Sequence, residues 1–311
     1  MYIVTGATGH IGNNVVKYLV SLNKEVRVLV RKYDDSLKDL PIDIKIGDVF
    51  SLNFLDESIH EKDIVIHCAG FIDLLNKEKY QSFRTNYQGT KRISDLCLRK
   101  NNRLIYISSV DAIPKKKRGI VSEPLEINPK KLKTYYAKSK ALATDYILNQ
   151  IQLGLNAMIL YPSAVIGIND YKPSAAGREI LNVMKHRVVF SLKGGYNFID
   201  VSDVAKAIVI ASNSNLIDHI ILSNTDQTIH QLYEAIEDAT NTKKFIIPIP
   251  SFIARLAVLF TPKYSQMMIS AIQDNYHYSN HKMKKYLLSE LTPFTKTIKE
   301  TVAWLQAHNK E

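Results

Sequence analysis

Short apolar runs alternate with longer amphipathic runs along the first half of the chain. Tyr2–Thr5 is apolar and partly β-branched, which is typical of a buried strand, and from Ile11 onward the apolar residues recur at helical spacing. Further strand-like runs are Glu25–Arg31, Ile42–Asp48, Asp63–Gly70, Arg103–Ser109 and Asn156–Ser163, and helical patterns cover Tyr80–Arg99 and Tyr135–Leu153. This alternation predicts an α/β fold with a doubly wound parallel sheet and helices on both of its faces.

Small and polar residues gather where the predicted strands end. In a doubly wound sheet, ligands bind outside the carboxyl ends of the strands. The clusters at these ends are TGATGHIG, GDV, HCAG, ISS and YPSAVIG. Because they converge on one edge of the sheet, we expect the ligand site there.

The turn after the first predicted strand contains three glycines, Gly6, Gly9 and Gly12, at intervals of three residues. Such a turn points unpaired backbone N–H groups of a helix N-terminus at an anion such as pyrophosphate. Glycine permits the tight turn and lets a phosphate approach the backbone. We interpret the turn as a dinucleotide-binding loop; the alternative is a glycine-rich loop with a backbone role only.

The alternation of strands and helices loosens beyond Pro162. We therefore predict a dinucleotide-binding Rossmann domain over residues 1–162 and a smaller, mainly substrate-binding lobe over residues 163–311, interleaved with it. Helices are expected over Ala175–His186 and Thr228–Ala239, and a strand leads into a helix over residues 198–212 with Ser202 or Asp203 as its cap. The apolar run 252–260 is interpreted as a packing element or dimer face rather than a membrane anchor.

Composition is that of a folded soluble protein, with 46% hydrophobic and 23% charged residues among 311. Cys68 and Cys97 are too few for a disulfide framework, and neither a bilayer-spanning run nor a secretory signal is present, so we expect a cytoplasmic protein without a membrane span. The net charge of +11 fits solvated lysines, a funnel for a polyanionic cofactor or substrate or, third, nucleic-acid binding. We expect a small-molecule substrate, no nucleic acid and no metal.

Tyr136 and Lys140 are four residues apart and so share one face of a predicted helix. An ammonium beside a phenol stabilises the phenolate and lowers its pKa from about 10, which makes Tyr136 a candidate general acid and base. Lys140 would also anchor a cofactor ribose, and Ser109 would hold the reacting oxygen. Ser108 is the alternative serine, since strand alternation turns one of the pair toward the site. An ordinary amphipathic helix is the competing interpretation of the Tyr–Lys pair.

The end of the second predicted strand is basic, with Arg31 followed by Lys32. NAD sites commonly place an acid here to bind the ribose hydroxyls, and that acid would repel a 2′-phosphate. A guanidinium suits a phosphate, so we predict NADPH. Stacking of Arg31 on adenine, with NAD as the cofactor, is the alternative.

Other polar residues near strand ends have two interpretations each. Phe71, Ile72 and Asp73 could line the substrate pocket, although Asp73 could equally cap a helix. Asp111 is either a second polar contact for the substrate or a turn residue. His67 is interpreted as a core histidine rather than a catalyst.

Taken together, the motifs resemble the extended short-chain dehydrogenase/reductases, also called the NAD-dependent epimerase/dehydratase superfamily, over nearly the whole chain. TGATGHIG matches the TGxxGxxG loop, NYQGT the N-x-x-G-T motif, and YISS and YAKSK the Ser and Tyr-x-x-x-Lys elements. GDV, HCAG and YPSAVIG match segments that contact adenine, flank the cofactor, and reach nicotinamide and substrate. Beyond the glycines, Arg31, Lys32, Tyr136 and Lys140, the residues expected at the cofactor are Thr8, His10, Ile11, Asp48, Val49, Ala69, Gly70, Ser108, Tyr161, Pro162, Ser163 and Val165.

Within this superfamily the chain looks most like the dihydroflavonol-4-reductase-like group. Tyr161 and Ile166 replace the Arg and Tyr that sugar-nucleotide enzymes commonly keep. The resemblance implies an NADPH-dependent oxidoreductase that reduces a ketone or aldehyde by Ser/Tyr/Lys chemistry. An NAD-dependent nucleotide-sugar epimerase or dehydratase is the alternative, followed by a non-catalytic dinucleotide sensor. Members often form homodimers through the two long helices, which makes a homodimer possible here.

Overall fold

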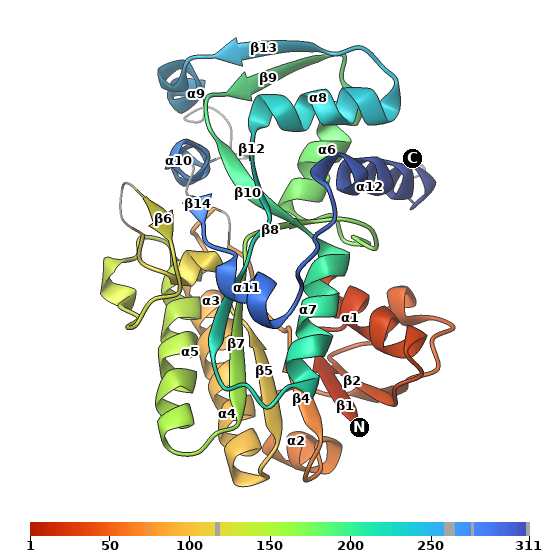
Figure 1. The fold of residues 1–311 in the computed structure, drawn as a ribbon, viewed down its shortest axis with the longest axis vertical. Helices are drawn as coiled ribbons and strands as arrows, with labels where there is room; N and C mark the ends of the chain where they lie inside the picture. Colours follow the sequence, from red (N-terminus) through yellow and green to blue (C-terminus); the bar gives the residue numbers. More distant parts are fainter. Residues whose placement is uncertain (74, 116–118, 258–264, 275–276, 309–311) are drawn as a thin grey trace.

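A parallel sheet forms the centre of the molecule in the computed structural model, which describes residues 1–311 except 74, 116–118, 258–264, 275–276 and 309–311 (Figure 1). Among these residues the sheet has seven strands in the order β11-β7-β5-β4-β1-β2-β3, and every pairing is parallel. The order changes direction between β1 and β4, so the loops after these two strands diverge and leave room for a ligand. The strands are β1 Tyr2–Thr5, β2 Val26–Val30, β3 Asp43–Ile46, β4 Ile64–His67, β5 Arg103–Ile107, β7 Ala157–Pro162 and β11 His219–Leu222.

Helices cover both faces of the sheet and enclose two apolar cores (Figure 1). On one face α1 and α7 bury Val16, Leu19 and Ile208 against the strands. On the other face α2, α4 and α5 bury residues such as Leu55 and Ile93. The helices are α1 His10–Ser21, α2 Leu52–Ser58, α4 Thr90–Arg99, α5 Tyr135–Gln152 and α7 Val201–Asn213. The predicted doubly wound α/β fold is therefore confirmed.

The long helix predicted over Tyr80–Arg99 is interrupted. It begins as α3, Lys79–Phe83, continues as a π-helical stretch over Arg84–Gly89 and resumes as α4. A π-helical stretch turns its side chains differently from the flanking α-helix, and such stretches are frequent at functional sites.

A smaller lobe is built from the C-terminal part of the chain and lies at the end of the molecule beyond the carboxyl ends of the strands (Figure 1). Its core packs β8 and β10 against α6, α8 and α12. β10 pairs with β8 and with β12, β13 pairs with β9, and β14 pairs with β6. In the part of the chain described, no helix is long and apolar enough to cross a membrane.

Two segments of this C-terminal part return to the main sheet: α7 packs on it and β11 forms its edge strand. The run predicted as an apolar helix over residues 252–260 forms α9 as far as Ala257, and residues 258–260 lie outside the described residues. The remaining elements are β6 Ile120–Val121, β8 Ala164–Ile166, α6 Ala175–Lys185, β9 Val188–Leu192, β10 Gly195–Asp200, β12 Thr225–Thr228, α8 Ile229–Thr240, β13 Phe245–Ile249, α9 Ser251–Ala257, α10 Gln266–Asp274, β14 His277–Tyr278, α11 His281–Tyr286 and α12 Phe294–His308.

The cap of α7 differs from the sequence prediction, which named Ser202 or Asp203. Asp200 is the cap, because its carboxylate accepts a hydrogen bond from the backbone N–H of Ser202 at 2.6 Å. Asp203 is buried within the first turn, where it accepts hydrogen bonds from Thr292. The helix therefore begins earlier than the spacing of polar residues indicated.

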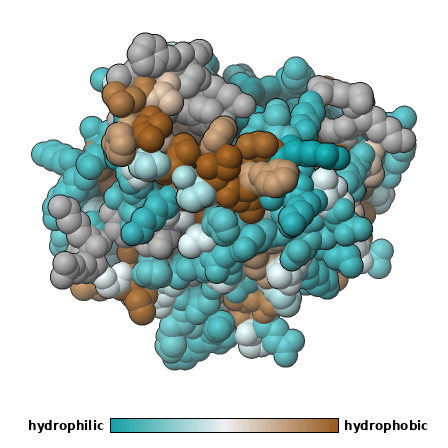
Figure 2. Space-filling model, turned by 90° about the horizontal axis from the view of Figure 1, so that it is seen from above, coloured by the Kyte–Doolittle hydropathy of each residue, from teal (hydrophilic) through white to brown (hydrophobic). Residues whose placement is uncertain are grey.

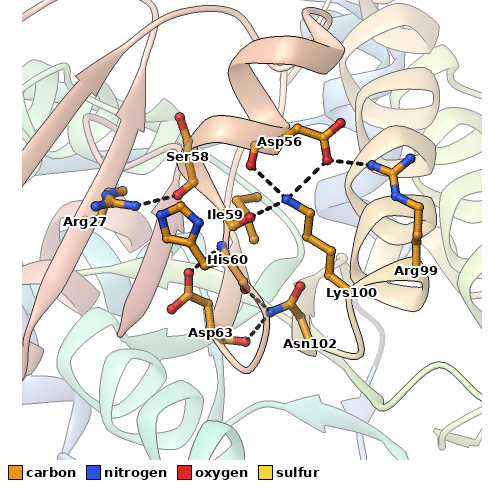
Figure 3. A network of polar contacts seen from close by, with 9 residues as sticks. All are labelled: Arg27, Asp56, Ser58, Ile59, His60, Asp63, Arg99, Lys100 and Asn102. Atoms are coloured by element: carbon orange, nitrogen blue, oxygen red, sulfur yellow. Dashed lines mark hydrogen bonds and ion pairs between the residues drawn. The ribbon is translucent and has the colours of Figure 1, made fainter.

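A polar network links the loops at the amino ends of the strands (Figure 3). The buried Asn102 amide donates to the carbonyl oxygens of His60 and Asp63, at 2.7 and 3.0 Å. Lys100 donates to the carbonyl oxygens of Asp56 and Ile59 (Figure 3). These contacts fix the loops before β4 and β5 at the edge opposite the predicted site.

Candidate active site

The glycine turn after β1 has two glycines that the fold itself requires. Gly6 has φ +70°, and a Cβ there would lie 2.5 Å from the backbone nitrogen of Ala69. A Cβ on Gly12 would lie 2.2 Å from the carbonyl oxygen of Gly6. Gly9 is exposed and a Cβ there would meet Gly6 O at a tolerable 3.4 Å, so the packing does not require glycine here, and its missing side chain leaves room for a ligand.

The N-terminus of α1 has the features of an anion-binding site. Gly9 is the N-cap and offers no side chain to the first helical amides, which belong to His10 and Ile11. The first turn of α1 contains no acidic residue. The helix end is positive, its first amides are uncapped, and the glycine before them is exposed. These features fit the binding of the pyrophosphate of a dinucleotide.

The loop after β8 supports this turn from the other side. His10 Nε2 lies 3.0 Å from the carbonyl oxygen of Ile168, and the Asn14 amide donates to the same oxygen at 3.0 Å. Lys17 donates to Asn169 Oδ1 at 2.6 Å. The His10 ring is thus engaged with the protein, and Thr8 is partly exposed on the turn.

Arg31 and Lys32 are exposed directly after β2, at the same edge of the sheet. The first acid beyond them, Asp34, accepts hydrogen bonds from Ser36 N and from Lys172 Nζ, the latter at 2.6 Å. The charge of Asp34 is therefore paired with the ammonium of Lys172. Asp48 and Val49 lie beyond β3 at the neighbouring strand end, where the Asp48 carboxylate accepts from Phe50 N at 3.0 Å.

Ser108 and Ser109 follow β5 and contact different residues of α5. The Ser108 hydroxyl is buried and lies 2.8 Å from Thr144 Oγ1 on α5. Ser109 Oγ accepts a hydrogen bond from Asp111 N at 3.1 Å and lies within reach of the Tyr136 hydroxyl. Ser109 is therefore the serine that faces Tyr136.

Tyr136 lies in the first turn of α5, which Thr134 caps by accepting a hydrogen bond from Ala137 N. Burial raises the pKa of the Tyr136 phenol, the Asp111 carboxylate raises it further, and the Ser109 hydroxyl opposes them by stabilising the phenolate. The phenol is protonated at neutral pH as a result.

Lys140 is held at the end of β5, and it is not among the groups that shift the pKa of Tyr136 in this structure. Its ammonium donates to the carbonyl oxygen of Ile107 at 2.7 Å, and burial lowers its pKa to about 8. The net pKa of Tyr136 is raised, not lowered. The helical spacing placed both side chains on one face but could not reveal that Lys140 turns toward the end of β5.

Asn86, from the π-helical stretch, braces the loop after β4 against α5. Its Oδ1 accepts from Phe71 N at 2.7 Å, while its Nδ2 donates to Phe71 O at 2.9 Å and to Ser139 Oγ at 3.0 Å. A Cβ on Gly70 would lie 3.3 Å from Lys140 Nζ and 3.4 Å from Asn86 Oδ1. Sequence reasoning did not name Asn86 as a site residue, although the NYQGT motif contains it.

The loop after β4 also places Ala69 beside Gly6 of the glycine turn, and it leaves Gly70 exposed. The preceding His67 is fully buried between Thr5 Oγ1 at 2.7 Å and Thr90 Oγ1 at 2.9 Å, and burial lowers the pKa of its imidazole to about 3. A neutral, doubly engaged ring agrees with the interpretation of His67 as a core histidine. Burial likewise raises the pKa of the Cys68 thiol to about 12.

Among the residues predicted to contact the substrate, Asp73 is buried and bonded within its own loop, whereas the others are exposed or partly exposed. The Asp73 carboxylate accepts from the backbone N–H groups of Lys77 and Glu78, so it organises the turn before α3. Ile72 is 62% exposed and Phe71 is partly exposed on the same loop. Asp111 is exposed, binds Lys115 Nζ at 2.9 Å and acts electrostatically on Tyr136.

Three residues beside Asp111 were not named from the sequence. Lys115 Nζ lies 5.5 Å from the ring centre of Tyr278, and Asp111 and Lys115 both act on the Tyr196 phenol. These side chains come from the loop before β6, from β14 and from β10. Their separation along the chain left no local signal in the sequence.

Only part of the YPSAVIG segment is accessible at the carboxyl edge of the sheet. Val165 is partly exposed, and the buried Ser163 hydroxyl has no hydrogen-bond partner among the described residues. Pro162 is buried at the end of β7. Tyr161 is 0% exposed, with its hydroxyl 3.3 Å from His219 Nδ1, so it is a core residue with no surface left for a cofactor in this conformation.

A cavity of about 500 Å³ lies elsewhere, between β12, α8 and the segment before α12. It is lined by polar residues including Gln231, Glu234 and Asp238. None of the predicted site residues lines it.

Comparison with known proteins agrees with the fold. A model of the NAD dependent epimerase/dehydratase family matches residues 2–221. Sterol demethylase protein B from Methylococcus capsulatus is 25% identical over 252 residues, which are 80% of this chain and 77% of that protein. A Synechocystis sp. protein named "Putative dihydroflavonol 4-reductase" is 35% identical over 219 residues, 68% of this chain and 62% of that protein. The 3 beta-hydroxysteroid dehydrogenase type 7 of Rattus norvegicus is 27% identical over 217 residues, 63% of each chain. The chain thus spans less than two thirds of the length of the latter two relatives.

Solved structures share the fold over almost the whole chain. The crystal structure of gox2253 matches with a TM-score of 0.86 and 22% identity, covering 99% of this chain and 98% of that one. The UDP-glucuronic acid 4-epimerase from Bacillus cereus, in complex with UDP-glucuronic acid and NAD, matches with a TM-score of 0.79 and 16% identity, covering 98% and 99%. Since the family model spans more than two thirds of the chain, the protein belongs to the NAD dependent epimerase/dehydratase family and is an NAD(P)-dependent enzyme.

Proposed function

We propose that this protein is an NADPH-dependent reductase of a small-molecule ketone or aldehyde. The observation that carries the proposal is the grouping of Ser109 with Tyr136 and of Lys140 with the end of β5, at the edge of the sheet where β1 leads into the uncapped N-terminus of α1. The named activities of the relatives, a 3 beta-hydroxysteroid dehydrogenase and a dihydroflavonol 4-reductase, support interconversion of an alcohol and a carbonyl group.

The reaction needs a proton donor at the substrate oxygen. Bound NADPH supplies the hydride to the carbonyl carbon. Tyr136 donates its proton to the oxygen, and its raised pKa keeps that proton in place at neutral pH. Ser109 donates a hydrogen bond to the same oxygen as negative charge builds there. Lys140, fixed on Ile107 O, has further N–H donors for a ribose hydroxyl.

The preference for NADPH rests on the exposed pair Arg31 and Lys32. Their position after β2 is where the adenosine ribose is held in this fold. Asp34, which could repel a 2′-phosphate, is matched by Lys172. A guanidinium can bind a phosphate through two parallel hydrogen bonds, which a ribose diol does not offer it.

The test is a titration of the purified protein with NADPH and NADH, after a check for nucleotide retained through purification. Wild type is compared with Arg31→Ala and with Lys299→Ala, an exposed lysine on α12, as the control. We expect NADPH to bind more tightly, and Arg31→Ala to lose about tenfold in affinity for NADPH only. A carbonyl screen then compares wild type with Tyr136→Phe, which should be inactive. Preference for NADH, or NAD retained in the purified protein, would contradict the proposal and favour a nucleotide-sugar epimerase or dehydratase.

A further inference from the structure

The small sheet of β9 and β13 has an apolar outer face. The parallel register places Val188 beside Phe245 and Phe190 beside Ile247. These side chains are 48%, 60%, 59% and 44% exposed, respectively. The alternate residue Val189 is buried in the core of the smaller lobe. Sheets with one solvated face normally carry polar residues on it, so this face is unusual.

Helix α9 extends this apolar surface. It follows β13 after Pro250, and its residues Phe252, Ile253 and Leu256 are 65%, 44% and 57% exposed. Spacings of three and four residues put Phe252, Ile253 and Leu256 on one side of the helix. Figure 2, viewed from the end of the molecule that carries β9 and β13, shows hydrophobic side chains gathered on this face. We call these seven residues of β9, β13 and α9 the apolar patch.

The surroundings of the apolar patch are basic. Lys185 and Arg187 precede β9, Lys193 follows it and Lys243 precedes β13, and all four are exposed. The sequence has no Asp or Glu over residues 180–199 or 239–273. The nearest acids are those at the end of α8, under the small sheet, where Glu237 accepts a hydrogen bond from Lys244 N at 2.7 Å, and the exposed Asp274 at the end of α10.

We propose that the apolar patch docks this protein onto an anionic lipid surface, with Phe190, Phe245 and Phe252 entering the interface between headgroups and acyl chains. Aromatic side chains combined with a basic rim are the features that bind a protein to anionic membranes without spanning them. A second copy of the chain fits less well, because two basic rims would face one another across the contact. The docking is peripheral and does not depend on which carbonyl compound is reduced.

Flotation of the full-length protein with lipid vesicles tests this assignment. One set of vesicles is phosphatidylcholine, and the other is phosphatidylcholine mixed with phosphatidylserine. Phe190→Ser/Phe245→Ser removes half of the exposed apolar face of the small sheet. The matched control is Tyr80→Ser/Leu125→Ser, because these residues are 75% and 99% exposed outside the apolar patch. Arg187→Glu/Lys193→Glu reverses the rim charge without touching an apolar residue.

We expect wild type and the Tyr80/Leu125 control to float with the phosphatidylserine vesicles, and high salt to weaken their binding. The double serine and double glutamate variants should each bind at least about tenfold more weakly, with unchanged thermal unfolding. Wild type that floats with neither vesicle overturns the proposal. So does a dimer, detected by analytical ultracentrifugation, that the double serine variant converts to monomers, because the apolar patch would then be an interface between copies.

Discussion

Replacing Lys140 by methionine should change how the stability of the protein depends on pH. The side chain is 4% exposed, and burial lowers the pKa of its ammonium from 10.5 to about 8. Between pH 8 and 10.5 the unfolded chain holds a proton on this lysine that the folded protein has lost. Stability therefore rises with pH across that window by about 1.4 kcal/mol per pH unit, or about 2 kcal/mol from pH 8 to 9.5.

The assay is urea unfolding of wild type, Lys140→Met and Lys138→Met at several pH values from 7 to 9.5. Lys138 lies on the same helix and is partly exposed, so its variant controls for loss of a lysine. From about pH 7 to pH 9.5, the free energy of unfolding of wild type should rise by about 2 kcal/mol relative to that of Lys140→Met. The free energy of unfolding of Lys138→Met should change with pH in the same way as that of wild type. Absolute values at pH 7 are less informative, since the methionine removes a buried charge but also leaves Ile107 O without its donor. A constant difference between wild type and Lys140→Met across the whole range would refute the assignment of a lowered pKa.

Two further predictions concern the glycine turn and the acid beside the phenol. Gly12→Ala should lower the free energy of unfolding by about 2–4 kcal/mol, because its Cβ would meet Gly6 O at 2.2 Å. Gly9→Ala should lower the free energy of unfolding by less than about 1 kcal/mol, yet it should weaken cofactor binding at least about tenfold. Urea unfolding and cofactor titration check this pair, and a Gly9→Ala protein with wild-type affinity would contradict the assigned phosphate site. Asp111→Asn removes a charge that raises the pKa of Tyr136, so the loss of carbonyl reduction at high pH should begin at a lower pH than in wild type. An unchanged profile of kcat/KM against pH would show that Asp111 does not act on the proton donor.

The sheet was predictable because its central strands are buried on both faces and therefore appear as continuous apolar runs. β5 and β7 are examples in which every residue is buried. The meeting of Ser109 with Tyr136 followed from a strand end and a helical spacing, both local signals. The orientation of Lys140 toward Ile107 O was not accessible, because a side chain's rotamer depends on tertiary packing. The pairing of β14 with β6 joins strands of two residues each that lie far apart in the sequence, so no pattern could indicate it.

The hydrogen bonds of Asn86 have a mechanical consequence. They join the loop at Phe71 to Ser139, which follows Tyr136 by three residues on the same helix and donates to the Tyr136 carbonyl oxygen at 2.8 Å. A displacement of that loop would therefore pull on the turn of α5 that carries Tyr136. One buried amide mechanically couples the loop beside the predicted site to the position of the phenol.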